Sequence, residues 1–166
     1  EYLMGGGTLQ YQRLETYPSI LGVGVSDLSM LGLTAEQGEL ALGRGTAIIG
    51  SQVAKNFYDP RWRPGQPQPT PPDLLGQTVK LILIKWTEDG IEVRKTVPVR
   101  VAGILAESRG ESDYSIYMGV DEVTAFNEWF MGRRINRNRD GYSMAIAKVT
   151  DVRQVLDITD QIIALG

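Results

Sequence analysis

The sequence predicts an α+β fold, in which helices pack on a mixed β-sheet that contains a long β-hairpin. The hairpin is indicated by alternating apolar and polar residues over Val79–Trp86 and again over Ile91–Leu105, on either side of the turn sequence Glu88-Asp89-Gly90. The helices are indicated by apolar residues three and four positions apart in the last third of the chain.

A chain of 166 residues corresponds to about one domain and can bury a core of its own. It is 42% hydrophobic and 22% charged, and a net charge of −3 gives no electrostatic reason to expect nucleic acid as a partner. No apolar run approaches the ~18–20 residues that cross a bilayer. Because the sequence starts at Glu1 without an initiator Met or a signal-peptide pattern, we expect a fragment or processed chain.

The N-terminal forty residues carry weak patterns. Glu1–Pro18 is poorly patterned, and the flexible run Gly5-Gly6-Gly7 within it favours a loop. The apolar, partly β-branched run Ile20–Val25 predicts a strand. The sequence Thr34-Ala35-Glu36-Gln37 favours one helical turn.

A second strand and a helix are predicted next. Thr46–Ile49 is an apolar strand sequence, and Ser51 is placed to cap a helix over Gln52–Phe57. Gly43-Arg44-Gly45 with Gly50-Ser51 is similar to a phosphate-binding turn before a helix. The lysine that a P-loop needs at this spacing is absent, so the sequence favours a tight turn and a helix cap.

Residues Asp59–Asp73 hold six of the eight prolines, which excludes helix and central strand and predicts an irregular surface insertion. Arg61, Trp62 and Arg63 are the candidate partner-binding residues in this insertion, because Trp and Arg are enriched where proteins bind one another. Trp62 could equally fold back and hold its own loop in place.

The second arm of the hairpin contains Pro98, which predicts an edge position or a bulge. Tyr114–Met118 is a further strand, and Asp121-Glu122 opens a helix at the end where acidic residues are favourable. On that helix Phe126, Trp129 and Phe130 are expected to face the core.

The densest basic cluster lies in the predicted loop Gly132–Gly141. Its four arginines could bind an acidic partner, lipid headgroups or nucleic acid, or they could simply be solvated, as charge runs usually are. These second candidate partner-binding residues are Arg133, Arg134, Arg137 and Arg139. A strand is predicted over Tyr142–Val149, and Asp151 is expected to cap the final helix. The apolar stripe of this helix consists of Val152, Val155, Leu156, Thr159, Ile162 and Ile163.

Two absent residue types limit the chemistry. The chain has no Cys and no His, so it lacks Ser-His-Asp and Cys-His catalysis and zinc sites of the usual kind. Glu107, Glu111 and Asp113 do not have the spacing of an EF-hand, which favours a polar loop over a cation site. We therefore expect no catalytic residue, no metal and no cofactor.

Five blocks of the sequence stand at 45–57, 74–79, 99–105, 115–123 and 145–165. The first reads as a strand, Gly-Ser and a helix ending in Phe, and the last as a strand, Asp and a long helix. In this order the five blocks resemble the MacB-like periplasmic core domain of FtsX-type ABC-transporter permeases. The chain departs from the family in its Pro-rich insertion, in Gly119 where proline is common, and in lacking an evident first strand and helix before Tyr17.

The resemblance implies a fold and a role. It implies porter-like βαβ elements and a single extracytoplasmic domain over residues 1–166, anchored to the cell membrane by segments outside the sequence, with the insertion at 59–73. It implies a non-catalytic domain that couples the transport cycle to an exported substrate or to a periplasmic or cell-surface protein. The other permease subunit and the cytoplasmic ATPase would be partners through the membrane part.

Two other functions remain open from the residues themselves. The chain could be a stand-alone extracytoplasmic domain that binds a small molecule or peptide in a pocket under the Pro-rich loop. It could also be a hydrolase with paired carboxylates, although nothing in the sequence selects a pair.

Overall fold

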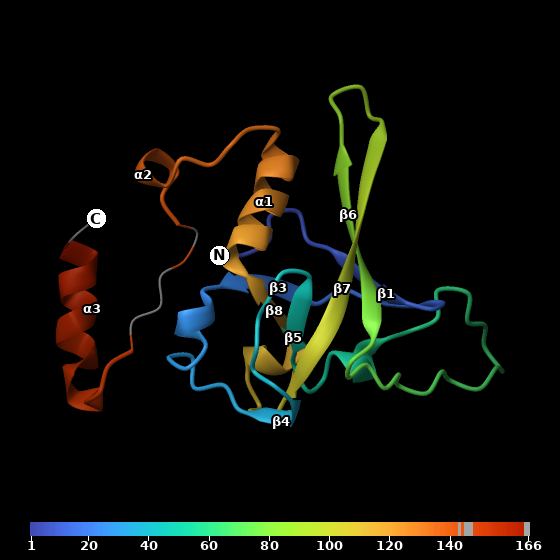
Figure 1. Ribbon diagram of the computed structural model, residues 1–166, viewed down its shortest axis with the longest axis horizontal. Helices are drawn as coiled ribbons and strands as arrows, with labels where there is room; N and C mark the ends of the chain where they lie inside the picture. The colour runs from blue at the N-terminus through green and yellow to red at the C-terminus, as the bar shows by residue number, and fades with distance from the viewer. Residues whose placement is uncertain (143, 145–147, 165–166) are drawn as a thin grey trace.

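A computed structural model describes residues 1–142, 144 and 148–164. Within them one mixed sheet has the strand order β2-β1-β6-β7-β5-β8-β3, and β4 pairs with β7 (Figure 1). The strands are β1 (Thr8–Tyr11), β2 (Leu14–Thr16), β3 (Ser19–Val23), β4 (Ala35–Gly38), β5 (Thr46–Ile49), β6 (Thr78–Trp86), β7 (Glu92–Leu105) and β8 (Ser115–Gly119). The helices are α1 (Val120–Met131), α2 (Arg137–Asp140) and α3 (Val155–Ala164), with short 3-10 turns η1 (Val25–Asp27), η2 (Ala54–Asn56), η3 (Glu111–Tyr114) and η4 (Val152–Gln154).

The predicted long hairpin is confirmed. β6 and β7 pair antiparallel from Thr78 opposite Arg100 to Trp86 opposite Glu92. Pro98 lies opposite Lys80, whereas β5 joins the other side of β7 only from Arg100 onward. Pro98 thus occupies an edge position, where its missing N–H costs no ladder hydrogen bond.

The sheet is mixed, as predicted, because β3 pairs parallel with β8 and β5 pairs parallel with β7. The chain passes directly from β8 into α1, which packs on β3 and β8. The strand predicted over Tyr142–Val149 lies largely outside the described residues, and its described positions Tyr142, Met144, Lys148 and Val149 are irregular.

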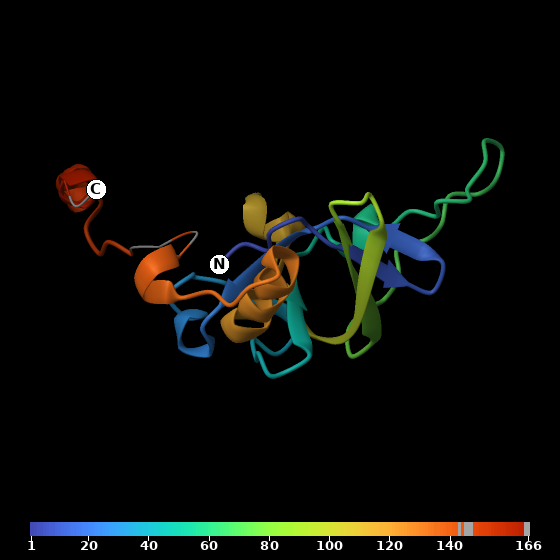
Figure 2. The same cartoon turned by 90° about the horizontal axis from the view of Figure 1, so that it is seen from above.

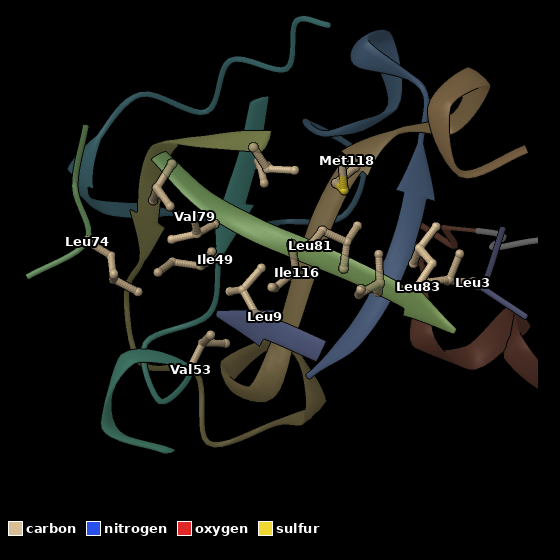
Figure 3. Close-up of a cluster of buried hydrophobic side chains, with 14 of the residues drawn as sticks. Leu3, Leu9, Ile49, Val53, Leu74, Val79, Leu81, Leu83, Ile116 and Met118 are labelled. Atoms are coloured by element: carbon tan, nitrogen blue, oxygen red, sulfur yellow. The ribbon is translucent and has the colours of Figure 1, made fainter. Parts of the chain in front are cut away.

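Two apolar clusters lie on opposite faces of the sheet because side chains alternate along each strand. Ile49 and Ile116 belong to the larger cluster, and their neighbours Ile48 and Tyr117 belong to the other. Figure 3 shows the larger cluster, whose labelled members are Leu3, Leu9, Ile49, Val53, Leu74, Val79, Leu81, Leu83, Ile116 and Met118. Helix α1 adds Val123 and Phe126 to it, as the helical spacing predicts.

The smaller cluster is covered by the segment that runs from η1 to β5. This segment contributes Leu28 and Leu42, both buried, with Leu31, Leu33 and Leu40 packed around them. Each leucine buried in this way stabilises the fold by roughly 1.5–3 kcal/mol relative to an exposed one. This segment therefore covers that face of the sheet, as a second helical layer does in other α+β folds.

The run Gly5-Gly6-Gly7 is irregular, as predicted, but the residues between it and Pro18 form two strands that no sequence pattern indicates. β1 and β2 form a hairpin whose turn has Gln12 at a φ of 54°, and β1 adds this hairpin to the edge of β6. The strands of three and four residues are too short to show a period in the sequence. Pairing with β6 supplies the order that local propensity does not.

The helical turn predicted over residues 34–37 is wrong, because β4 pairs with the end of β7. Glycines at 38 and 103 permit this close pairing. A Cβ atom at Gly38, which has a φ of +70°, would overlap the carbonyl oxygen of Ala102, and one at Gly103 would overlap that of Glu39. The strand partner thus overrides the helix propensity of Ala, Glu and Gln.

The helix predicted over Gln52–Phe57 is a single 3-10 turn, η2. Val53 and Phe57 are buried as predicted. Ser51 does not cap the turn, because the carbonyl oxygen of Gly50 accepts the hydrogen bond from the Val53 N–H at 3.1 Å.

One buried polar side chain fastens the N-terminal residues to α1. The Asn127 amide is 0% exposed, donates to the Tyr2 carbonyl at 2.9 Å and accepts from the Met4 N–H at 2.7 Å. Gly132, in the left-handed conformation at φ 67°, ends the helix.

The last helix lies apart from the sheet, at the opposite end of the molecule from the Pro-rich segment (Figure 2). The predicted cap is confirmed, since the Asp151 carboxylate accepts from the Arg153 N–H at 3.0 Å. The apolar stripe is uncovered, with Leu156 76% and Ile163 71% exposed. Among the described helices none has the length and apolar character needed to cross a bilayer.

Candidate functional site

The Pro-rich segment is irregular and exposed, as predicted, and Trp62 holds it in shape. The indole Nε1–H of Trp62 donates to the Gln66 carbonyl at 3.1 Å, and the Arg63 N–H donates to the Gln66 side-chain oxygen at 3.1 Å. Trp62 is still 39% exposed. It therefore organises its own loop while leaving part of the indole available at the surface.

The base of the segment is tied to the β1–β2 hairpin. Arg13 forms an ion pair with Asp59 at 3.1 Å, and the Tyr58 hydroxyl donates to the Tyr17 hydroxyl at 3.2 Å. The hydrogen bond with Tyr17, followed by partial burial, raises the pKa of Tyr58 to about 12. Arg61 and Arg63 follow this anchored base and are exposed, and none of the ion pairs formed by the described residues involves them.

The basic loop is organised around one aspartate. The Asp140 carboxylate pairs with Arg133 at 2.8 Å and with Arg139 at 3.0 Å, and it accepts from the Asn136 N–H at 2.9 Å. The Arg133 hydrogen bond, then that of Arg139, holds the pKa of Asp140 well below its usual range. The side chains of Arg133 and Arg139 are thus largely engaged in bonds within the loop.

The Arg137 side chain also bonds within the protein, whereas the Arg134 side chain forms no ion pair among the described residues. Arg137 donates to the Thr124 hydroxyl at 2.7 Å, forms an ion pair with Glu1 at 3.2 Å and lies over the Tyr142 ring. Arg134 is exposed, and its guanidinium takes part in no ion pair formed within the described residues. The four arginines therefore share a loop but do not form one open patch.

An open cleft of about 690 Å³ lies under the end of the Pro-rich segment, between β4 and η2. The sequence places a candidate pocket under the Pro-rich loop but identifies none of its residues. The residues that line the cleft come from four separate segments of the chain. They are Glu36, Gln37, Ser51, Ala54, Lys55, Pro71, Pro72, Asp73, Leu74, Ile104, Ala106 and Glu107. No periodicity or motif links these positions, so sequence reasoning could not have assembled them.

One of the carboxylates considered for a cation site, Asp113, is engaged by the backbone of its own loop. Asp113 is 2% exposed and accepts from the backbone N–H groups of Ser108 and Arg109, so it closes its own loop. The Ser108 N–H is the main cause that lowers the pKa of Asp113. No group of three or more acidic, His or Cys side chains within the described ranges could hold a metal ion.

The turn at 43–45 is structural, as the sequence favours. The Gly45 N–H donates to the Glu122 carboxylate at 2.9 Å, and the Gly43 N–H donates to the Thr46 hydroxyl at 2.6 Å. These amides are satisfied by side chains of the protein itself, so they do not form an open phosphate cradle.

Sequence reasoning missed an exposed apolar pair at the tip of the long hairpin. Trp86 is 66% exposed and Ile91 is 61% exposed, on either side of the turn that Gly90 closes. The signal was present, since large apolar residues flank the turn sequence directly. The period-two alternation predicts that Trp86 lies on one face of a strand. It does not show that the tip of the hairpin extends beyond the neighbouring strands of the sheet (Figure 1).

The chain is similar to known proteins over nearly its whole length. The sequence profile described as the MacB-like periplasmic core domain matches residues 2–165. Among solved structures, the extracellular domain of the non-canonical ABC-type transporter YknZ from Gram-positive bacteria aligns with a TM-score of 0.53 and 15% identity, covering 94% of this chain. A domain assigned to a permease protein from Porphyromonas gingivalis aligns with a TM-score of 0.46 and 14% identity, covering 96% of this chain.

The chain spans 66% of the YknZ domain and 61% of the Porphyromonas domain. No curated protein matches the sequence. At 15% identity the YknZ likeness speaks for the fold alone.

Proposed function

The chain belongs to the family of MacB-like periplasmic core domains, and on that premise we propose that it is a non-catalytic module that couples a permease's transport cycle to a partner protein or exported substrate. The family is that of the extracytoplasmic domains of ABC-transporter permeases. The match over residues 2–165 carries the proposal. The absence of His and Cys from the sequence supports the non-catalytic part.

The internal connections of the domain suit a coupling role. Asn127 ties the N-terminal residues to α1, and the Lys85 ammonium of the hairpin donates to the Trp129 carbonyl near the end of the same helix at 2.6 Å. These contacts hold the N-terminal residues and the hairpin against α1, so the three parts are connected as a coupling module requires. We propose that the other permease subunit and the cytoplasmic ATPase act on it through the membrane part of the protein.

We propose that the partner or substrate contacts the Pro-rich segment through Arg61, Trp62 and Arg63, and the basic loop through Arg134. The free guanidinium groups support this assignment, since an unpaired Arg loses no internal bond when it binds a carboxylate. Arg133, Arg137 and Arg139 would contribute by holding the loop in shape.

The location is tested in the full-length protein with its other cysteines removed. We expect a cysteine at exposed Ser29 to react with a membrane-impermeant maleimide on intact bacterial cells, and one at Ile48, which is 0% exposed, to stay unlabelled until the protein unfolds. Labelling of Ser29→Cys only after the cells are permeabilised would overturn the extracytoplasmic assignment.

The contact surface is tested by complementation of a strain that lacks the gene. The variant Arg61→Ala with Arg63→Ala should reach wild-type levels in the membrane but fail to restore transport, because it leaves the Trp62–Gln66 bond intact. The control Gln68→Ala, in the same exposed segment, should restore it. Full transport by the double variant would remove these arginines from the contact.

A second candidate function is a stand-alone binding domain, and the cleft under the Pro-rich segment is the observation that favours it. The two functions differ in where the native protein is found. Recovery of the native gene product in the membrane fraction, released only by detergent, favours the permease domain. Recovery wholly in the aqueous fraction favours the stand-alone domain.

A further inference from the structure

We propose that α3 is a strap that closes over a methionine-lined surface of its own domain and docks there by its apolar stripe. The inference goes beyond the proposed function, and it requires neither a permease nor a partner protein. Four observations support it: an uncovered helix face, a surface of matching chemistry, a short connection between the two, and opposite net charges.

The apolar stripe of α3 is uncovered along its length. Val152 just before the helix is 85% exposed, Leu156 is 76% and Ile163 is 71% exposed, and none of the ten residues of α3 is buried. A helix of this length is marginal in water by itself, and in proteins its stability comes mainly from packing of the apolar face. The stripe therefore needs a surface to pack on.

A surface of matching chemistry lies in the same domain. It consists of two cavities of about 300 and 280 Å³, which adjoin because both are lined by Glu1 and Tyr142. Their methionines, two in each cavity, are Met30 and Met144, and Met4 and Met131. These are four of the five methionines of the chain. Because unbranched thioether side chains adapt to irregular apolar partners, this methionine surface suits the aliphatic side chains of α3.

The connection between the surface and the helix is short, which selects the chain's own α3 as the occupant. Lys148 lines the first cavity, and α3 begins at Val155. The chain between these two residues spans at most roughly 25 Å when extended. A helix tethered in this way is present at the surface at an effective concentration on the order of millimolar, above that of a dilute second molecule. Both views place α3 on the side of the molecule that carries α2 and the N-terminus (Figure 1, Figure 2).

The net charges of the two parts are opposite. Residues 132–141, which border the second cavity, contain four arginines and one aspartate, whereas residues 151–164 contain three aspartates and one arginine. Asp160 borders the stripe, because it lies four positions after Leu156 and three before Ile163. None of the ion pairs formed by the described residues involves Asp160. Docking by the stripe therefore brings a free carboxylate towards the basic loop.

The test is the rate of maleimide labelling of single cysteines in the 166-residue chain, which has no cysteine of its own. Leu156→Cys should react at least about fivefold more slowly than Gln161→Cys on the opposite face of the same helix, because docking covers only the stripe. Each rate is divided by the rate in concentrated urea. An undocked α3 would give equal rates, since both positions are exposed in the open helix.

The reciprocal experiment probes the methionine surface. Making the stripe polar with Leu156→Gln and Ile163→Gln should raise the labelling rate of Met4→Cys at least about threefold, because the surface is then left open. The matched change on the polar face, Gln154→Asn with Gln161→Asn, should leave that rate unchanged. A cysteine at Gln68, in the exposed Pro-rich segment, should react alike in all three backgrounds, and thermal melting should confirm that each variant folds.

Dilution separates the chain's own helix from that of a second copy. Protection of Leu156→Cys should be the same from about 100 μM down to about 1 μM protein, since an intramolecular contact does not depend on concentration. Protection that disappears on dilution would assign the stripe to a second copy and overturn the proposal. Equal labelling at residues 156 and 161, or an unchanged rate for Met4→Cys when the stripe is made polar, would overturn it as well.

Discussion

Gly50 shows how closely single residues are constrained where β5 ends. A Cβ atom at this position would overlap the carbonyl oxygens of Ser112 and Asp113. The backbone segments meet here because the Gly50 N–H donates to the Ser115 carbonyl and the Gln52 N–H donates to the Asp113 carbonyl. The glycine is therefore required by close approach of two backbones, and not by an unusual conformation of its own.

We expect Gly50→Ala to lower the free energy of unfolding by about 1–3 kcal/mol, since the added methyl group must displace backbone. Urea denaturation measures the change. The control Gly43→Ala, whose Cβ would meet only the Thr46 hydroxyl at 3.8 Å, should change stability by less than about 0.5 kcal/mol. Equal stabilities for Gly50→Ala and the parent chain would show that the two backbones can separate at little cost.

Asn127 is a second residue whose role no sequence pattern indicates. On the helix it occupies a position beside the apolar Phe126, and its amide is hidden only because residues 1–4 fold over it. A buried amide costs free energy unless it is hydrogen-bonded, and here three bonds satisfy it. An asparagine in a helix is therefore explained by a contact more than a hundred residues away in sequence.

At the scale of elements, the long hairpin is fixed to α1 by cationic side chains. The Lys85 ammonium lies 4.6 Å from the centre of the Trp129 ring, and the Lys95 ammonium lies 5.5 Å from that of Phe126. Lys85 also donates to the carbonyl of Trp129, close to the negative end of the helix dipole. The hairpin and the helix are thus held together where the apolar core ends.

A double-mutant cycle with Lys85→Met and Trp129→Leu should give a coupling energy of about 0.5–1 kcal/mol, the usual size of a partly exposed cation–π contact. Each variant is measured by urea denaturation. As a control, Lys85→Met combined with Trp62→Leu in the Pro-rich segment should be additive. No coupling between residues 85 and 129 would mean that the hydrogen bond to the backbone alone fastens the hairpin.

At the scale of the whole molecule, the groups of the described residues whose pKa values are lowered are three carboxyls. Hydrogen bonds from Ser108, Arg133 and Arg153 lower the pKa values of Asp113, Asp140 and Asp151 respectively. A carboxyl whose pKa is lower in the folded state adds stability above its unfolded value of about 3.9, and this stability is lost as the pH falls through the folded value. The sequence contains no His that would titrate near neutral pH.

We therefore expect the free energy of unfolding to be nearly constant from about pH 5.5 to 8 and to fall below about pH 4. Urea denaturation at a series of pH values tests both parts. Asp140→Asn should reduce the loss on acidification, because it removes one of the shifted carboxyls. A stability maximum that moves within the neutral range would contradict this account.

The sequence by itself determined the features that need only a long pattern or a composition. Nine residues of β6 and fourteen of β7 show the period of a strand, the prolines at 59–73 exclude regular structure, and the missing His and Cys limit the chemistry. Helix α1 was equally clear, because twelve residues cover three turns of apolar spacing. These patterns are local in the sequence, so they can be recognised without knowledge of the fold.

The tertiary structure alone decided which short segments become strands and which side chains meet. β1, β2 and β4 have four residues or fewer, and they are ordered by backbone pairing with β6 and β7 and not by their own propensity. The same holds for the cleft, whose rim joins Glu36, Lys55, Asp73 and Glu107. A binding surface assembled across such distances in sequence leaves no periodic signal, because the folded sheet alone brings its parts together.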